Sequence, residues 1–153
     1  MVMVDNLYFE ATGGGITFGG GEPLLRADFI VEFCQLVKAD ERIHVPWRIT
    51  VETSLNVSTT NLDKVMPFVD HFIVDIKDMN PQIYQNYTSQ TPDLLIRNLK
   101  LLGETMNAQS TIRLPLIPHY NTPEDVQQSR KQLESMGFCD FDEFEYIIQD
   151  TKS

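Results

Sequence analysis

The 153-residue sequence has very little cysteine: Cys34 and Cys139 lie far apart and form no CxxC or CxxxCxxC pattern. The cysteines therefore predict neither a metal site nor a cluster site. Cys34 falls on an apolar helical stripe with Ile30, Phe33 and Val37, so we expect it to be a small core residue. Cys139 falls in an expected loop, and we expect it to be structural as well. A disulfide between the two would be unusual in the cytosol.

Other absences exclude further classes of protein. No apolar run approaches the ~20 residues that cross a bilayer, so no membrane association is expected. The opening MVMVDNLYFE carries Asp5 and Glu10 and no basic region, unlike a signal peptide, and a cytoplasmic location is expected. The sequence has no Lys/Arg run and a net charge of -10, so nucleic acid is not an expected partner. Without an internal repeat or a low-complexity linker, residues 1–153 are expected to form one domain.

What the sequence does contain is an alternation of β-type and helical segments. Strands are expected at 16–18, 47–53, 71–77, 111–117 and 144–148. Helices are expected at 26–38 and about 62–66, and from 80, 91 and 122 onward. This order predicts an α/β fold with about five parallel strands and flanking helices, either a doubly wound sheet or part of a (β/α) barrel. A full barrel needs about 250 residues, so five units would form an incomplete wall. The apolar run 71–77 is typical of a strand covered on both faces.

Three helix starts carry capping signals. Thr60 and Asp63 have the spacing of a capping box, and Thr91 precedes a Pro-Asp pair. Thr122 precedes a proline and two acidic residues, which is the strongest signal of the three, and Gly137 is the expected stop of that helix.

Polar residues follow the expected strands at the ends where parallel sheets bind ligands. One face would collect Glu22, Glu52, Asp75, Lys77 and Arg113. Carboxylates suit an ammonium group, and lysine or arginine suits a carboxylate, so the set suits a zwitterionic ligand. Structural interpretations compete with this one. Asp75 and Lys77 share one side of a strand and could form a salt-linked strand end, and Arg113 could have a purely structural partner.

A run of three glycines precedes Glu22 and permits positive φ and a close approach of the backbone to a ligand. It matches neither GxGxxG nor a P-loop, and by itself it is equally consistent with a tight connection from strand to helix. The histidines, His44, His71 and His119, share no metal-like spacing, and we expect surface or loop positions for them.

Four blocks occur in order: GGGITFGGGEPLL, VETS, FIVDIKDMNP and IRLPLIPHYN. From Gly13 to about Asn121 the chain resembles pyruvate formate-lyase activating enzyme and related glycyl-radical activating enzymes of the radical S-adenosylmethionine (SAM) superfamily. The resemblance implies a partial (β/α) TIM-like barrel in which a 4Fe-4S cluster binds SAM and cleaves it reductively. The resulting 5′-deoxyadenosyl radical takes a hydrogen atom from a glycine of the partner enzyme. The implied partners are that glycyl-radical enzyme and an electron donor such as flavodoxin or ferredoxin.

The resemblance also assigns a set of SAM-binding residues: Gly20, Gly21, Glu22, Glu52, Ser54, Asp75, Lys77 and Arg113. The glycine turn with Glu22 would meet the methionyl amino group. Glu52 stands where the family has an aspartate that helps to hold the methionyl or ribose portion. Lys77, in a D-x-K motif, is expected near the methionyl carboxylate, and Arg113 also faces the cofactor.

Several positions depart from the family pattern. Gly19 replaces the usual serine before Gly-Gly-Glu. The usual D-T-S/N-G block reads ETSL at 52–55, so its turn glycine is replaced by Leu55. His119 replaces another common glycine.

The largest departure is that the CxxxCxxC loop, which precedes the Gly-rich block in the family, does not occur in this sequence. We therefore expect no cluster, no metal ligand and no catalytic residue in this chain, a missing first barrel strand, and an open edge at strand 16–18 that invites pairing. Three interpretations follow: an internal piece of an activating enzyme that is inactive alone, a cluster-less relative that binds SAM or a partner, or a radical-SAM enzyme that acts on a small molecule.

Overall fold

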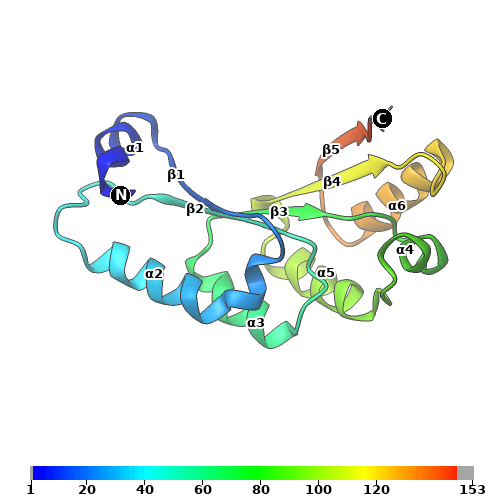
Figure 1. The fold of residues 1–153 in the computed structure, drawn as a ribbon, viewed down its shortest axis with the longest axis horizontal. Coiled ribbons are helices and arrows are strands. Elements are labelled where there is room, and N and C mark those ends of the chain that lie inside the picture. The colour runs from blue at the N-terminus through cyan, green and yellow to red at the C-terminus, as the bar shows by residue number, and fades with distance from the viewer. Residues whose placement is uncertain (1, 148–153) are drawn as a thin grey trace, which may run out of the picture.

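The computed structural model describes residues 2–147, and five of its segments form one parallel sheet. The strands are β1 (Gly15–Phe18), β2 (Arg48–Thr53), β3 (His71–Asp75), β4 (Ser110–Leu116) and β5 (Asp140–Glu145). They lie side by side in the order β1-β2-β3-β4-β5 (Figure 1). A doubly wound sheet reverses its strand order at a switch point, whereas this sheet keeps the chain order throughout. The strand order therefore favours the wall of a (β/α) barrel over the doubly wound alternative.

Among residues 2–147, six α-helices connect or precede the strands. They are α1 (Asn6–Thr12), α2 (Ala27–Ala39), α3 (Thr59–Val65), α4 (Pro81–Thr88), α5 (Asp93–Thr105) and α6 (Pro123–Ser135). Short 3-10 turns lie at Val2–Asp5, Pro23–Arg26, Met66–Phe68 and Asn107–Gln109. Within residues 2–147, no helix is both long and apolar enough to traverse a bilayer.

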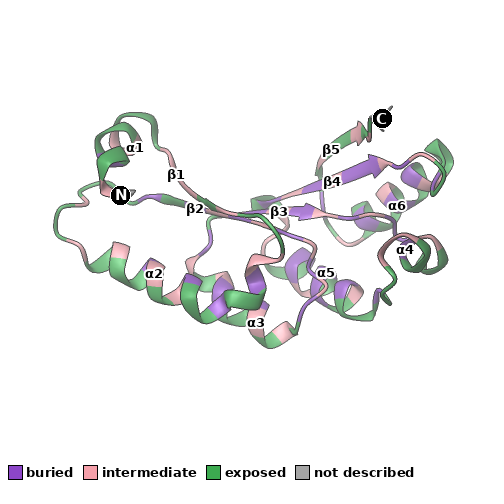
Figure 2. Ribbon diagram, viewed as in Figure 1, coloured by how far each residue is buried: buried purple, intermediate pink, exposed green. Residues whose placement is uncertain are grey.

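The sheet has one face covered by helices and one face that is more open. In Figure 1, α2, α3 and α5 lie along the same side of the sheet. Val51, Phe72 and Ile112 of the sheet are fully buried and share one core cluster with residues of these helices. Figure 2 shows buried residues both on the central strands and on the helices. The alternating residues of β3, His71 and Ile73 among them, are half-buried. The expectation that residues 71–77 are covered on both faces was therefore wrong, and the open face is available for a site.

The helix starts were predicted with mixed success. At α6, Thr122 and Asp125 form the expected capping box, and Gly137, at a φ of 100°, follows the last turn. At α3 the N-cap is Ser58, so Thr60 and Asp63 lie inside the helix and form no capping box. At α5 the N-cap is Pro92 without a side-chain cap, so Thr91 does not cap that helix.

The last strand and one cysteine also differ from expectation. β5 begins at Asp140, several residues before the expected 144–148, and position 148 lies outside the described residues. Four of the six residues in its sequence DFDEFE are acidic, and this polarity concealed the strand. Cys34 is buried as expected, but Cys139 is exposed, so its expected structural role was wrong.

β1 is an edge of the described sheet. It pairs with β2, and no other strand of residues 2–147 pairs with it. Its pairing with another chain stays a prediction.

Candidate functional site

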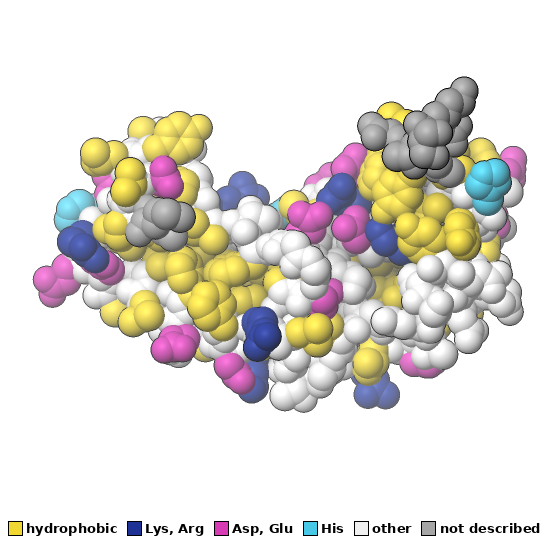
Figure 3. Space-filling model, viewed as in Figure 1, with side chains coloured by type: hydrophobic (Ala, Val, Ile, Leu, Met, Phe, Trp, Pro, Cys, Tyr) yellow, Lys and Arg dark blue, Asp and Glu magenta, His cyan; other side chains and the backbone are white. Residues whose placement is uncertain are grey.

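A cavity of about 330 Å³ opens at the carboxyl ends of β1, β2 and β3. Its lining residues are Gly20, Gly21, Glu22, Glu52, Thr53, Ser54, Asp75 and Lys77. The structure thus brings together every residue of the predicted set except Arg113, which contacts Glu52 beside the cavity. Figure 3 shows the open face as a hollow between the ends of the molecule that carry α1 and β5.

The carboxylate of Glu22 fastens the glycine turn to the end of β2. One of its oxygens accepts from the backbone N–H of Leu24 at 3.1 Å and from the hydroxyl of Thr53 at 2.7 Å. The other accepts from the backbone N–H of Ser54 at 2.9 Å and from its hydroxyl at 2.6 Å. Four donors nearly saturate a carboxylate. Glu22 therefore acts as a positioning residue for the turn, with little capacity left for a ligand.

The glycine turn leaves open space at its apex. Gly20 and Gly21 have φ values of +76° and +63°, which other residues adopt only with strain. A Cβ atom built on either glycine would meet no atom within 4 Å. The turn is therefore a backbone cradle whose outer side is free for a ligand.

Arg113 on β4 is the centre of a charge cluster on the open face. Its Nη1 donates to Glu52 at 2.6 Å, and its Nε lies 3.6 Å from Asp75 and 3.7 Å from Asp142. Asp75 and Asp142 are the register partners of Arg113 on the two neighbouring strands. The guanidinium also lies 5.2 Å from the centroid of the Phe144 ring. One cation thus faces three carboxylates, which leaves a locally negative site.

The Nε atom of Arg113 is buried and has no hydrogen-bond partner within residues 2–147. Burying an unsatisfied donor costs about 1–3 kcal/mol. The carboxylates of Asp75 and Asp142, 3.6 and 3.7 Å from this atom, offset part of the cost by their charge.

Three site residues on or just after β5 were not predicted from the sequence: Asp142, Phe144 and Tyr146. Tyr146 Oη lies 2.6 Å from Nζ of Lys77. Every second residue from Asp140 onward faces the open side, as the contacts of these residues show. A strand placed over 140–145 would have put them beside Arg113 and Lys77.

Three buried polar residues behind the site, Asp78, Asn121 and Ser129, also escaped prediction. Asp78 follows Lys77 and is 2% exposed. It accepts from the hydroxyl of Ser129 at 3.1 Å and from the amide of Asn121 at 3.2 Å. The same amide donates to the carbonyl of Pro115 at 3.1 Å. This network joins the ends of β3 and β4 to α6 and fixes the backbone after Lys77.

The two residues that replace family glycines keep a glycine-like backbone. Leu55 has a φ of 57° and His119 a φ of 70°. A buried asparagine holds each turn: Asn98 donates to the carbonyl of Leu55 at 2.8 Å, and Asn121 accepts from the N–H of Ile117 at 2.6 Å. Surrounding hydrogen bonds thus maintain two left-handed residues that would otherwise be unfavourable.

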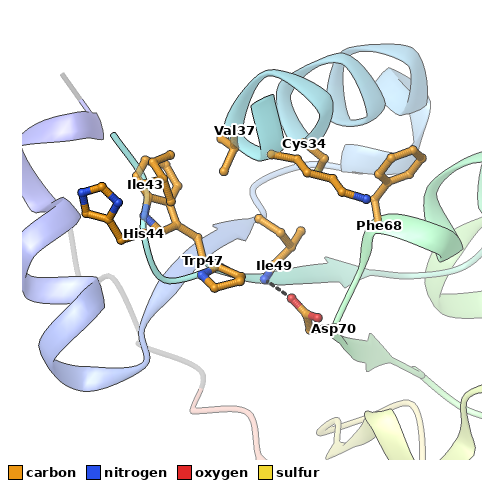
Figure 4. Close-up of a pocket in the computed structure, with 10 residues that line it drawn as sticks. Cys34, Val37, Ile43, His44, Trp47, Ile49, Phe68 and Asp70 are labelled. Carbon is orange, nitrogen blue, oxygen red and sulfur yellow. Dashed lines mark hydrogen bonds between the residues drawn. The ribbon is translucent and has the colours of Figure 1, made fainter. Parts of the chain in front are cut away.

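A second cavity, of about 320 Å³, lies at the opposite end of the sheet (Figure 4). Its walls include Cys34, Trp47, Phe68 and Asp70. The carboxylate of Asp70 accepts from the N–H of Ile49 at 2.7 Å, and burial raises the pKa of the Cys34 thiol. A buried thiol with a raised pKa is a poor nucleophile and a poor metal ligand.

The histidines do not form a metal site. His44 and His119 are exposed in loops as expected, whereas His71 is half-buried in β3, with its Nε2 2.8 Å from the Thr111 hydroxyl. Burial lowers the pKa of His71. No group of three or more His, Cys, Asp and Glu residues within the described chain could hold a metal ion.

The model of the Radical SAM superfamily matches residues 3–133. The chain belongs to the radical SAM superfamily. It is 36% identical over 118 residues to the (2S)-3-sulfopropanediol dehydratase activating enzyme of Klebsiella oxytoca, a match that covers 76% of this chain and 35% of that protein. It is 33% identical to the indoleacetate decarboxylase activating enzyme of Tractidigestivibacter scatoligenes, with 73% and 34% covered. The chain thus spans about a third of the length of these radical-SAM relatives, which confirm the resemblance to activating enzymes.

Solved structures confirm the radical-SAM fold. A domain of the pyruvate-formate lyase-activating enzyme from Bacteroides vulgatus ATCC 8482 superposes with a TM-score of 0.55 at 20% identity, covering 85% of this chain and 98% of that one. Coproporphyrinogen III oxidase (HemN) from Escherichia coli superposes with a TM-score of 0.68 at 18% identity, covering 88% and 32%. The expected partial (β/α) barrel wall is therefore correct.

Proposed function

We propose that this chain is the SAM-binding part of an activating enzyme that generates a glycyl radical on a partner enzyme. The observation that carries the proposal is the cavity that the glycine turn lines together with three carboxylates (Glu22, Glu52 and Asp75) and the ammonium group of Lys77. The names of its relatives support an activating role. Because the chain spans about a third of their length, the complete reaction is proposed for a longer protein of this type.

The cavity residues fit the methionyl end of SAM. The carbonyl groups of the glycine turn and the carboxylates of Glu52 and Asp75 are acceptors for the amino group. The Lys77 ammonium suits the carboxylate. Glu22 and Ser54 contribute by holding the turn against β2.

In this family, the 4Fe-4S cluster supplies the electron that cleaves SAM. The residues described here do not fit a cluster, because no suitable group of ligands lies together within 2–147. The role that we assign to this chain is therefore to bind and orient SAM. We further infer a glycyl-radical enzyme as protein substrate, flavodoxin or ferredoxin as electron donor, and an anaerobic cytoplasmic setting.

Isothermal titration of the chain with SAM tests the proposal. Lys77→Met should weaken SAM binding by about tenfold, which corresponds to ~1.4 kcal/mol, because the ligand carboxylate loses its ammonium partner. Lys131→Met, in an exposed part of α6, is the matched control and should bind like the wild type. Absence of SAM binding to the wild type, or equal affinities of all three proteins, would overturn the proposal.

A further inference from the structure

We propose that Tyr146 is a further SAM-binding residue, which donates its phenolic hydrogen bond to the ligand carboxylate beside Lys77. This inference rests on the function proposed above. It assigns a role to the residue that follows β5, which lies outside the four sequence blocks that resemble the family.

Tyr146 contacts Lys77 and is itself held by its neighbours. Lys77 Nζ lies 2.6 Å from Tyr146 Oη and 5.2 Å from the centroid of the ring. The backbone N–H of Tyr146 donates to the carbonyl of Leu116 at 3.0 Å, so this residue continues the pairing of β5 with β4. The Phe144 ring packs against Tyr146 with centroids 5.5 Å apart. The tyrosine is therefore held in place by its backbone and by a neighbouring ring.

The chemistry of the pair fixes the direction of its hydrogen bond. A lysine ammonium has three donors and no acceptor, so Nζ donates and the phenolic oxygen accepts. The hydroxyl proton of Tyr146 then remains free, since no acceptor for it is found within residues 2–147. Because its oxygen already accepts from a cation, this hydroxyl is polarised and becomes a stronger donor.

The free donor selects the kind of ligand group that can bind. Lys77 offers only donors and Tyr146 adds its free hydroxyl proton, so the pair suits an anion, and the Lys77 charge repels an ammonium group. The acceptors of the cavity lie elsewhere, on Glu52 and Asp75. The two ends of a zwitterion are thereby distinguished, and the carboxylate end falls to Lys77 and Tyr146.

A purely structural role for Tyr146 would make a different prediction. If the ring only shielded Lys77, loss of the hydroxyl would affect every ligand of the cavity equally. If the hydroxyl binds the carboxylate, its loss matters only for ligands that carry a carboxylate. Decarboxylated SAM, which lacks this group and keeps the rest of the molecule, separates the two roles.

The experiment measures the affinities of SAM and decarboxylated SAM for the full chain and for Tyr146→Phe by isothermal titration. We expect Tyr146→Phe to weaken SAM by about tenfold, because a hydrogen bond to a charged group is lost. Its affinity for decarboxylated SAM should stay that of the wild type. Tyr8→Phe, on an exposed part of α1, is the matched control and should change neither affinity.

The outcomes separate the two proposals. If the wild type binds SAM and Tyr146→Phe binds it equally well, or loses affinity for both ligands alike, the role of Tyr146 is overturned while the proposed function stands. If the wild type binds neither ligand, the proposed function fails and this inference fails with it. Thermal unfolding of Tyr146→Phe checks that the variant folds like the wild type.

Discussion

Arg113 of β4 donates to Glu52 of β2 at 2.6 Å, although β3 lies between these two strands. The guanidinium crosses the open face above Asp75, its register partner on β3. The pair thus ties three strands together at the edge of the cavity. Both side chains are about one-third exposed, so solvent weakens the electrostatic attraction between them.

Arg113→Met should lower the free energy of unfolding by about 1–2 kcal/mol, because Glu52, Asp75 and Asp142 would then face one another without a cation. Urea unfolding measures the change. Arg97→Met, in an exposed part of α5, is the control and should be close to neutral. Adding Glu52→Gln to Arg113→Met should recover part of the loss, and no recovery would argue against carboxylate repulsion as its cause.

Glu22→Gln should loosen the glycine turn. One carboxylate oxygen accepts from Leu24 and Thr53, and the other accepts twice from Ser54. An amide has only one accepting oxygen, and its nitrogen donates, so one of these two pairs of hydrogen bonds must be lost. We expect a loss of about 1–3 kcal/mol in unfolding free energy, measured by urea titration, and weaker SAM binding. Glu104→Gln, at an exposed position of α5, is the matched control and should change neither quantity. A Glu22→Gln protein as stable as the wild type would show that the turn does not depend on these bonds.

Most of the fold was predictable because its determinants are local. Apolar β-branched runs marked β2, β3 and β4, and Thr122 with its following proline and acids marked α6. The cavity was predictable because the carboxyl ends of parallel strands meet at one edge. Residues that are distant in the sequence could therefore be assigned to one site before their distances were known.

The missed features depend on tertiary context. β5 is rich in acids, so it does not look like a strand in the sequence. In the fold, the positive charge of Arg113 compensates the negative charge of Asp142 on the open face. α1 is seven residues long, has no side-chain cap and packs through Phe9 on Trp47, a contact between distant segments. The left-handed backbone at Leu55 could not be predicted from the sequence, because it is held by a hydrogen bond from the distant Asn98 to the Leu55 carbonyl.

His119→Gly should stabilise the protein by up to about 1 kcal/mol, because glycine removes the strain of a φ of 70° at an exposed position. Thermal and urea unfolding measure the gain. Leu55→Gly relieves similar strain but deletes a fully buried side chain, so it should instead lose about 2–4 kcal/mol. His44→Gly, at an exposed loop position without positive φ, should be slightly destabilising, and a gain there as well would exclude backbone strain as the explanation.

The stability of the protein should depend on the protonation of His71. Burial lowers the pKa of His71 below its ordinary value of 6.5, so the unfolded chain binds more protons than the folded one at weakly acidic pH. The free energy of unfolding should therefore fall as the pH drops through 6.5 toward the lower pKa of the folded state. His71→Gln should flatten this decline in urea titrations, whereas the exposed control His44→Gln should retain it. A His71→Gln protein with the wild-type pH profile would contradict the assignment.

Anaerobic reconstitution with iron and sulfide should give no stoichiometric 4Fe-4S cluster on this chain. Cluster ligands are thiolates, and burial together with the charge of Asp70 raises the pKa of the Cys34 thiol and disfavours its thiolate. Cys139 is exposed, and neither cysteine belongs to a described group of metal-binding residues. Iron content and charge-transfer absorbance should therefore be the same for the wild type and for a Cys34→Ser/Cys139→Ser variant. About four irons per wild-type chain, lost in this variant, would show that the two cysteines do support a cluster.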